Sequence, residues 1–300
     1  MSSVIFVFLD GFGLGPAGPD NPLSQYDWPH LGRLLGARPV LGEWVRAPDR
    51  LLTPLDATLG VEGTPQSATG QVSLFTGRNA PRELGYHLPA YPNRRLRAML
   101  DEDNILKHTA DACLRSTFAN AYSSEYFRYA EAGKVRHSAT TLSVLAAGQP
   151  FRMLEDLLAG RAVFWDITNA ELSSRAGYEH VPLVAAEVAG ERLARLASDY
   201  HLVLFECFQP DRVGHRRDRE AAESFLKVLD GFLGTCREAL PESASLVVCS
   251  DHGNLEDLAA GGHTRNPVPL IVLGPAARQF AGATDITQVA PAIYRCLGVA

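Results

Sequence analysis

The chain has 300 residues, of which 46% are hydrophobic and 21% are charged. This is the composition of an ordinary globular protein, long enough for a full core and a second small domain. Its formal net charge of -6 argues against a nucleic-acid-binding protein that relies on a diffuse basic surface. No apolar run approaches the length of a membrane span. The first apolar run, Val4–Leu9, is not preceded by the basic residues that begin a secretory signal peptide. We therefore expect a cytoplasmic protein that binds neither nucleic acid nor a membrane, and the composition indicates no particular oligomeric state.

The cysteines support the same compartment. There are 5 of them, an odd number, and no two form a C-x-x-C pair. Cys207 and Cys249 lie in apolar runs that predict strands, so we expect buried, reduced thiols.

The first predicted element is Val4–Leu9, a continuous apolar run typical of a strand that is buried on both faces of a parallel sheet. Asp10-Gly11-Phe12-Gly13 follows directly. An acidic residue at the carboxyl end of a central strand, followed by glycines, lies where open α/β sheets place their sites. A solvated loop aspartate is the alternative. Residues 16–30 predict a surface loop, and Leu31–Leu35 predicts a short helix.

The segment of residues 63–77 begins with turn formers and continues with helical spacing, so we expect a loop that delivers Ser67 to the first turn of a helix. A hydroxyl there lies among unpaired backbone N–H groups at the positive end of the helix dipole, which suits a phosphate or an oxyanion. The alternative is structural, because serine is a common N-cap residue.

Residues 83–182 differ in sequence pattern from the segments on either side. We expect them to form an inserted cap domain between core segments 1–82 and 183–300. The predicted elements of the insert are a helix that follows the arginine cluster and runs through Leu100, short strands at Leu114–Ala119 and Ala162–Trp165, and helices at Ser138–Ala147 and Arg152–Leu158.

After the insert, helices and strands alternate again. The predicted elements are helix Ala185–Ser198, strand Leu202–Phe208, helix Glu220–Leu240, strands Ser245–Ser250 and Leu270–Leu273, and a closing helix over Ile286–Leu297. Three apolar strands are thus followed by Asp10, Asp211 and Asp251, with helices between them. This order predicts a doubly wound α/β architecture with acids gathered along one sheet edge.

Histidines accompany these acids. Asp211 and His215 are one helical turn apart, Asp251 and His252 are adjacent just after a strand, and His263 lies in a glycine-rich loop. Any one of these histidines taken alone is more often a surface or core residue than a ligand. Together with three carboxylates, which repel one another without cations, they predict a metal site. A ligand set of nitrogen and oxygen suits Zn²⁺ or Mn²⁺ better than Ca²⁺, with Mg²⁺ as a further option.

The motifs Asp10-Gly-Phe-Gly, the Ser67 loop, Asp211-x-x-Gly-His215, Asp251-His252-Gly-Asn and His263-Thr-x-Asn-Pro-Val-Pro occur in this order. In them the chain resembles the alkaline phosphatase superfamily, in particular the branch of cofactor-independent phosphoglycerate mutases and phosphopentomutases. The likeness covers residues 1–82 and 183–300. It implies a three-layer α/β/α sandwich with a mostly parallel central sheet and a small inserted α+β cap.

The same resemblance implies a nucleophile and two divalent metal ions. Ser67 matches the serine that becomes phosphorylated. One metal ion would be held by Asp10, Ser67, Asp251 and His252, and the other by Asp211, His215 and His263. Such ions lower the pKa of the serine and neutralise the incoming phosphate, which gives a two-step mechanism with a phosphoseryl intermediate.

Two departures from the family favour hydrolysis over mutase chemistry. Gln71 stands where the mutases commonly have a histidine, and the insert is shorter than the substrate domain of the long phosphoglycerate mutases. We therefore predict a phosphohydrolase acting on a small phosphorylated substrate. A phosphomutase of a small sugar or acid is the first alternative. A phosphodiesterase, a sulfatase and a metal-binding protein without turnover are the others.

The insert would choose the substrate. Its candidates for gripping a second anionic group are Arg94, Arg95, Arg97, Arg128, Arg136 and Arg175. For each of them a solvated surface arginine is the alternative. The aromatic residues around Tyr122–Tyr129 either line a pocket or pack in the core.

Overall fold

The computed structural model describes residues 3–299, and its centre is a seven-stranded sheet with the strand order β2-β3-β9-β8-β1-β7-β4. The strands are β1 (Ser3–Leu9), β2 (Val45–Arg46), β3 (Arg50–Leu55), β4 (Ser116–Phe118), β7 (Leu202–Cys207), β8 (Ala244–Ser250) and β9 (Val268–Leu273). A second sheet contains only β5 (Ala121–Tyr122) and β6 (Arg152–Met153). The predicted strands that begin at Val4, Leu202, Ser245 and Leu270 are therefore confirmed.

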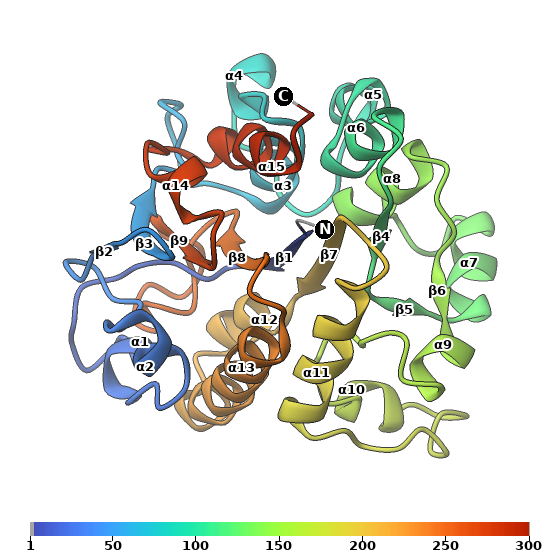
Figure 1. Cartoon of the computed structure of the whole chain (residues 1–300). Coiled ribbons are helices and arrows are strands. Elements are labelled where there is room, and N and C mark those ends of the chain that lie inside the picture. Colours follow the sequence, from blue (N-terminus) through green and yellow to red (C-terminus); the bar gives the residue numbers. More distant parts are fainter. Residues whose placement is uncertain (1–2, 300) are drawn as a thin grey trace.

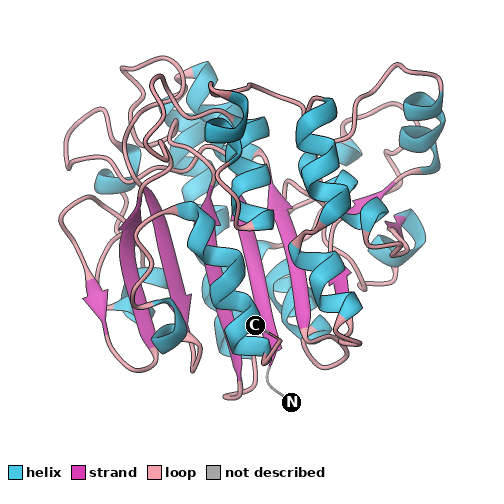
Figure 2. Ribbon diagram, turned by 90° about the horizontal axis from the view of Figure 1, so that it is seen from above, coloured by secondary structure: helices cyan, strands magenta, loops and turns pink. Residues whose placement is uncertain are grey.

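Helices cover both faces of the main sheet (Figures 1 and 2). They are α1 (Pro22–Gln25), α2 (Leu31–Leu35), α3 (Ser67–Thr76), α4 (Ala80–Leu84), α5 (Arg94–Glu102), α6 (Ile105–Asp111), α7 (Ser124–Glu131), α8 (Ala139–Ala146), α9 (Leu154–Leu158), α10 (Ala170–Ser173), α11 (Ala186–Leu196), α12 (Gln209–Arg216), α13 (Arg219–Ala239), α14 (Ala277–Phe280) and α15 (Val289–Leu297), with a 3-10 turn at Ile286–Gln288.

The alternation of side chains along β1 shows why there are three layers. Phe6 and Phe8 point into one hydrophobic core, which is shared with α3, α5 and α15, whereas Ile5 and Val7 point into a second core, shared with α11 and α13. A strand that is apolar at every position has no face left for solvent, so helices must cover both faces. The predicted α/β/α sandwich is confirmed.

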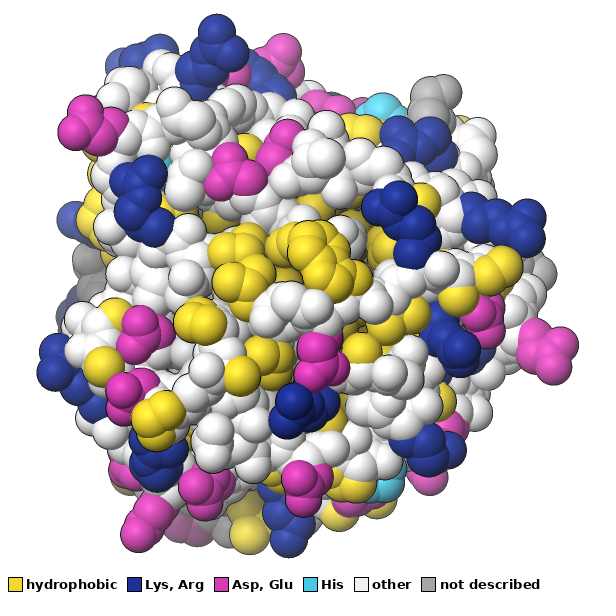
Figure 3. Space-filling view, turned by 90° about the vertical axis from the view of Figure 1, so that its left-hand side faces the viewer, with side chains coloured by type: hydrophobic (Ala, Val, Ile, Leu, Met, Phe, Trp, Pro, Cys, Tyr) yellow, Lys and Arg dark blue, Asp and Glu magenta, His cyan; other side chains and the backbone are white. Residues whose placement is uncertain are grey.

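The sheet is mixed, which corrects the expectation of a mostly parallel one. Strands β4, β7, β1 and β8 run parallel, but β9 pairs antiparallel with both β8 and β3, and β2 pairs antiparallel with β3. The sequence analysis did not predict β3. Its first residue, Arg50, is exposed, and Pro54 next to its end interrupts its apolar pattern. Figure 3 shows the face at this β2 edge, where hydrophobic side chains gather. Leu41 and Trp44, just before β2, are among the exposed ones.

Residues 83–182 do not pack as one separate unit, so the predicted cap domain is not confirmed as such. Strand β4 extends the main sheet by pairing with β7, and Leu96 of α5 and Ile105 of α6 lie in the same core as α3. Only the later part, with Leu157 and Phe164, forms a small hydrophobic cluster of its own.

One local prediction in this segment was wrong, and another was confirmed except for its first two residues. Ala162–Trp165 is not a strand, because its only ladder contact among the described residues is an isolated bridge between Val163 and Asn120. The predicted helix at Arg152–Leu158 starts at Leu154, since the first two residues pair with β5. No helix within residues 3–299 has both the length and the apolar composition to span a membrane.

Candidate active site

The three predicted acids lie at the carboxyl ends of neighbouring parallel strands. Asp10 follows β1, Asp251 follows β8, and Asp211 lies in α12 just after β7. Because β1 lies between the other two strands, its aspartate is held between theirs. The chain then adds Ser67 from the start of α3 and His263 from the loop before β9. Asp10, Ser67, Asp211, His215, Asp251, His252 and His263 together are called the acid–histidine cluster below.

Three oxygen atoms approach one nitrogen atom in the first half of this cluster. The Nε2 atom of His252 lies 2.9 Å from Ser67 Oγ, 3.2 Å from Asp10 Oδ1 and 3.6 Å from Asp251 Oδ2. All four side chains are buried. Asp251 and His252 are adjacent in the chain, yet both bend inward because they lie just past the end of β8, as expected.

The second half of the cluster is more open. Asp211 and His215 are one turn apart on α12, with His215 Nε2 3.4 Å from Asp211 Oδ2. His263 Nε2 lies 3.3 Å from Asp211 Oδ1 and 3.3 Å from His215 Nε2. The rings of His252 and His263 are stacked, with centroids 3.7 Å apart, so the two halves are in direct contact.

Backbone carbonyl groups orient two of the histidines. His252 Nδ1 lies 3.3 Å from the carbonyl oxygen of Gly253, and His263 Nδ1 lies 3.2 Å from that of Pro65. A ring that donates its Nδ1 proton to a carbonyl group keeps the lone pair of Nε2 free toward the cluster. This is the arrangement in which imidazoles bind metal ions.

Ser67 is the first residue of α3, and its hydroxyl group faces His252. The N-cap position belongs to Gln66, and the described structure contains no side-chain cap hydrogen bond at this helix. The capping alternative for Ser67 is therefore wrong.

Glycine at position 70 allows α3 to approach the end of β8. A Cβ atom there would lie 2.7 Å from the backbone oxygen of Asp251 and 2.9 Å from its Cβ atom. These are closer than real Cβ contacts, and neither neighbour is the flexible end of a long side chain. The tight approach is thus a condition for bringing Ser67 and Asp251 together.

We expect Gly70→Ala to destabilise the protein by roughly 1–3 kcal/mol, the usual cost of overpacking, and to weaken metal binding. Alanine is the better helix former by about 1 kcal/mol, so a net loss has to come from the clash. Thermal unfolding and metal titration measure the two effects. Gly282→Ala is the matched control, because its Cβ would meet none of the described atoms within 4 Å. An unchanged or more stable Gly70→Ala variant would contradict the close approach.

The electrostatics of the cluster indicate an excess of negative charge. Burial raises the pKa of Asp251 to about 8, and Asp10 and Asp211 add to the rise, although His252 opposes it. Burial alone would lower the pKa of His252, but Asp251 and Asp10 outweigh it and raise the pKa to about 10. Asp10 likewise has a raised pKa through burial, which His252 opposes. Without a metal ion, protons on this group of residues offset part of that charge. Burial would also raise the pKa of Asp211, but hydrogen bonds from His263 and Asn254 oppose it and hold that pKa low, at about 2.

These residues fit a metal ion. Asp10 Oδ1 is buried and, although His252 Nε2 lies 3.2 Å away, it accepts no well-formed hydrogen bond within residues 3–299. The cluster combines three carboxylates, three imidazoles and a hydroxyl group. Donor atoms from Asp10, Asp251 and His252 lie within 4.8 Å of one another, as do those from Asp211, His252 and His263. Oxygen and imidazole donors together suit Zn²⁺ or Mn²⁺.

Several residues that support the cluster were not identified from the sequence. Gln71 donates to Asp251 Oδ2 at 3.2 Å, and Asn254 donates to Asp211 Oδ1 at 2.7 Å. The buried Glu256 accepts from the backbone N–H groups of Gly13 and Asn254 at 3.0 and 2.7 Å and from the Thr264 hydroxyl group. It therefore connects the loops after β1 and β8 to the loop of His263. Gln71, Asn254 and Thr264 lay in motifs that the sequence analysis quoted, but their supporting contacts were not predicted, and Glu256 lay in none of these motifs.

Glu206, in β7, was also missed, because one acid inside an apolar run has no local signal. It is buried beside the cavity described below, its Oε2 atom accepts from the Thr140 hydroxyl group at 2.7 Å, and its Oε1 atom has no partner in the described part of the chain. Burial raises its pKa well above the usual range. The Thr140 hydrogen bond opposes this rise, and Asp10 and Asp251 add to it.

We expect Glu206→Gln to raise the melting temperature of metal-free protein at pH 8 and to change it little at pH 5. A carboxyl group whose pKa is higher in the folded than in the unfolded state loses its stabilising contribution as the pH rises above the unfolded value. The amide has no such proton to lose and can still accept from Thr140. Thermal unfolding at both pH values measures this, with exposed Glu131→Gln as the control. A difference in melting temperature between the two proteins that does not grow with pH would contradict the raised pKa of Glu206.

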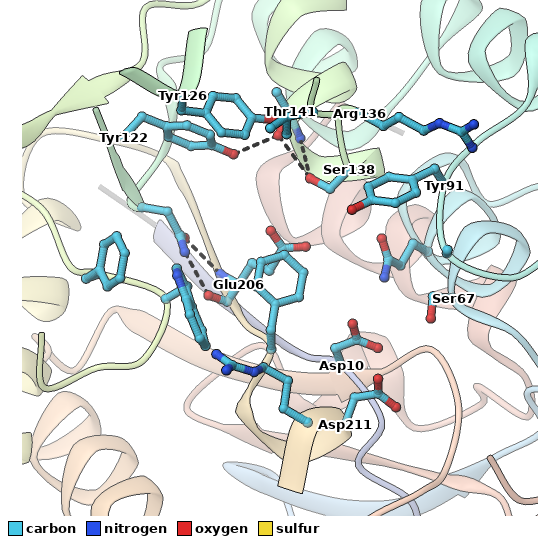
Figure 4. Close-up of a pocket in the computed structure, with 18 of the residues that line it drawn as sticks. Asp10, Ser67, Tyr91, Tyr122, Tyr126, Arg136, Ser138, Thr141, Glu206 and Asp211 are labelled. Carbon is cyan, nitrogen blue, oxygen red and sulfur yellow. Dashed lines mark hydrogen bonds between the residues drawn. The ribbon is translucent and has the colours of Figure 1, made fainter. Parts of the chain in front are cut away.

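A cavity of about 700 Å³ opens beside Ser67, Asp10 and Asp211 (Figure 4). Of the predicted substrate-binding arginines, Arg136 and Arg175 line it, and Arg94 and Arg97 line a neighbouring cavity that shares Arg136. Arg95 and Arg128 are not among the described residues that line either cavity. Arg212, which the sequence analysis did not single out, lines the first one.

The chain is similar to known metalloenzymes in both sequence and fold. A family model described as the Metalloenzyme superfamily matches residues 2–300. The 2,3-bisphosphoglycerate-independent phosphoglycerate mutase of Cereibacter sphaeroides is 32% identical over 133 residues, which are 41% of this chain and 26% of that protein. The chain thus matches about a quarter of the length of this curated relative.

Two solved structures show the same fold at low sequence identity. The alkaline phosphatase of the Antarctic bacterium TAB5 is 13% identical and has a TM-score of 0.59, over 99% of this chain and 97% of that one. The phosphoglycerate mutase of Leishmania mexicana is 11% identical and has a TM-score of 0.60, over 99% and 95%. Both have the layered α/β architecture described above.

Proposed function

The chain belongs to the Metalloenzyme superfamily, and we propose that it is a two-metal phosphohydrolase that cleaves phosphate esters through a phosphoseryl intermediate on Ser67. The observation that carries this proposal is the position of Ser67. Its hydroxyl group lies at the start of α3, 2.9 Å from His252 Nε2 and next to the cavity. A nucleophile, a positively polarised helix terminus and a metal-binding donor set then meet at one point.

The family implies divalent metal ions, and we propose two, Mn²⁺ or Zn²⁺ with Mg²⁺ as an option. Asp10, Ser67, Asp251 and His252 would hold one, and Asp211, His215 and His263 the other. When bound, these ions supply Lewis acidity that favours the serine alkoxide and offsets the charge of the phosphate. The buried carboxylates of Asp10 and Asp251 and the partly buried one of Asp211 support this assignment, because their negative charge needs a partner.

The residues of this chain then perform two substitutions at phosphorus. Ser67 Oγ, having lost its proton, forms a bond to phosphorus while the bond between phosphorus and the ester oxygen breaks, and the alcohol leaves with a proton. In the second step a water oxygen bonds to phosphorus, the bond to Ser67 Oγ breaks, one proton of the water returns to Ser67 Oγ, and inorganic phosphate leaves. The partial positive charge at the start of α3 would favour the phosphate beside Ser67 in both steps.

A phosphomutase is the second candidate, because the curated relative with 32% identity is named a phosphoglycerate mutase. In a mutase the phosphoryl group returns from the serine to the same organic product, whereas a phosphatase gives it to water. Phosphodiesterase or sulfatase activity, or metal binding without turnover, is less well supported.

The experiment that separates these functions measures inorganic phosphate released from a panel of phosphomonoesters. Metal-stripped protein is used, with Mn²⁺, Zn²⁺ or Mg²⁺ added back. Release that depends on the metal supports the phosphatase. Positional isomerisation of the ester without release, together with a phosphorylated Ser67 peptide, would replace the phosphatase by the mutase. Turnover without any divalent metal would contradict both.

The setting of the reaction is part of the same proposal. The family implies a small phosphorylated substrate, and we place the enzyme in the cytoplasm. Within residues 83–182, the part that we propose as a substrate-selecting cap contains β5, β6, α7, α9 and α10. Its support is that Tyr122, Tyr126 and Leu157 from this part line the cavity next to Ser67.

A further inference from the structure

The cavity beside Ser67 has polar residues at one end and aromatic rings over much of the rest. Ser67, Asp10 and Asp211 line the polar end. The aromatic residues that line the cavity are Tyr91, Tyr122, Tyr126, Phe164, Trp165, Tyr178 and Phe208. A volume of about 700 Å³ lies within the range of pockets that enclose drug-sized ligands.

The rings are held in place by one another. Trp165 lies 5.9 Å from Phe208 and 5.7 Å from Phe164 between ring centroids, and Tyr122 lies 4.8 Å from Tyr126. Trp165 and Phe208 are only partly buried, so part of each ring faces the hollow. Apolar surface left facing an open cavity is unfavourable, and a ligand with a matching apolar face would cover it.

Most polar groups of this wall already bond to one another, as Figure 4 shows for several of them. The Tyr122 hydroxyl group lies 2.7 Å from Thr141 Oγ1, which lies 2.9 Å from Ser138 Oγ. The Asn120 side chain exchanges two hydrogen bonds with the backbone of Glu206. Apart from Glu206 Oε1, a substrate rich in hydroxyl groups would find few free partners here, and burying such groups without partners is costly.

Of the three arginines that line the cavity, Arg212 is paired with an acid, and Arg175 and Arg136 are exposed. Arg212 lies over the ring of Trp165 at 4.9 Å and forms an ion pair of 3.1 Å with Glu171. Arg175 lies over the ring of Phe164 at 5.9 Å. Arg136 forms no ion pair in the described part of the chain, but it is exposed, at the rim. The inner wall therefore offers flat apolar faces rather than free charge.

We infer that the alcohol half of the substrate is a bulky, flat aromatic group that stacks within this wall, while its phosphate lies at the acid–histidine cluster. The preferred substrate class is thus a phosphomonoester of an aromatic alcohol, not a phosphorylated small acid or sugar. This inference rests on the proposed phosphohydrolase function and deepens it.

The test compares two esters that differ in the bulk of the alcohol but leave similarly as primary alcohols, 2-naphthylmethyl phosphate and glycerol 1-phosphate. Activated phenyl esters are avoided, because their better leaving group would raise the rate without any binding. We expect kcat/KM to be roughly 10- to 100-fold higher for the naphthylmethyl ester, the range that one apolar pocket contact provides.

Variants at Trp165 connect this preference to the wall. Trp165→Ala should reduce the ratio of the two kcat/KM values by about tenfold, and Trp165→Phe, which keeps a ring, should restore much of it. Trp44→Ala is the matched control, because Trp44 is 64% exposed and does not line the cavity. It should leave the ratio unchanged.

A binding measurement without turnover keeps the inference separable from the proposed function. Titration of the metal-free Ser67→Ala protein with 2-naphthylmethanol should show saturable binding that Trp165→Ala weakens. If neither ester releases phosphate but the alcohol binds, the proposed function fails and the aromatic pocket stands. A preference for glycerol 1-phosphate, or no binding of the alcohol, would overturn the inference while leaving the phosphohydrolase intact.

Discussion

Replacement of Ser67 by alanine should reduce phosphate release by on the order of 10³-fold or more, the scale seen when a nucleophile is removed. The substitution takes away the atom that bonds to phosphorus. It should leave the fold intact, because the hydroxyl group contacts His252 among the described residues and the helix does not depend on it for capping. Phosphate release and thermal unfolding, measured on the same preparation, separate the two effects.

Ser73→Ala in the same helix is the matched control. The Ser73 hydroxyl group donates to the backbone oxygen of Thr69 and accepts from the backbone N–H of Ala80. Its loss should lower stability by about 1–3 kcal/mol but leave turnover largely in place, the reverse of the Ser67 result. Full activity in Ser67→Ala would rule out the covalent mechanism, and a labelled phosphate on any other residue would move the nucleophile.

Removal of metal ions should abolish activity and lower the melting temperature. Binding to the native state alone stabilises a protein by about 2.7 kcal/mol at a ligand concentration of 100 times Kd, and chelation reverses this. It also leaves the carboxylates of Asp10, Asp211 and Asp251 facing one another without a cation. Activity and thermal unfolding are measured before chelation, after it, and after each ion is returned.

Mn²⁺ or Zn²⁺ should restore both properties, and Ca²⁺ serves as the control. Calcium prefers shells of six to eight oxygen ligands, whereas His215, His252 and His263 contribute nitrogen atoms. We expect Ca²⁺ to restore little activity. Equal rescue by Ca²⁺ would argue against the imidazole ligands, and unchanged activity after thorough chelation would exclude a metal-dependent reaction.

Much of the architecture could be read from the chain because its strongest signals are local. Val4–Leu9, Leu202–Cys207 and Ala244–Ser250 are apolar at nearly every position, and each is followed within a few residues by an acid. Parallel strands bring their carboxyl ends to one edge, so the convergence of Asp10, Asp211 and Asp251 follows from the strand assignment alone. The motif order then identified Ser67 and the histidines as their companions.

The tertiary structure decided the features that depend on residues far apart in the chain. The antiparallel edge of the sheet required the pairing of β9 with β3, and the division of residues 83–182 required the pairing of β4 with β7. Neither pairing has a local signal, since a short or interrupted strand is identified by its neighbours. For the same reason, only the tertiary structure shows which of the predicted arginines line a cavity and which do not.

Glu206 and Trp165 show most clearly what could not be predicted from the sequence. Glu206 is one acid in an apolar run, and only its burial, together with the nearby Asp10 and Asp251, raises the pKa of its carboxyl group. Trp165 is one ring among many, and only its position beside Phe208 makes it part of a pocket wall. The sequence by itself determined which residues carry the reactive groups, because residue type and order are written in it. Burial, charge balance and pocket shape arose only from folding, because they are properties of what surrounds a residue.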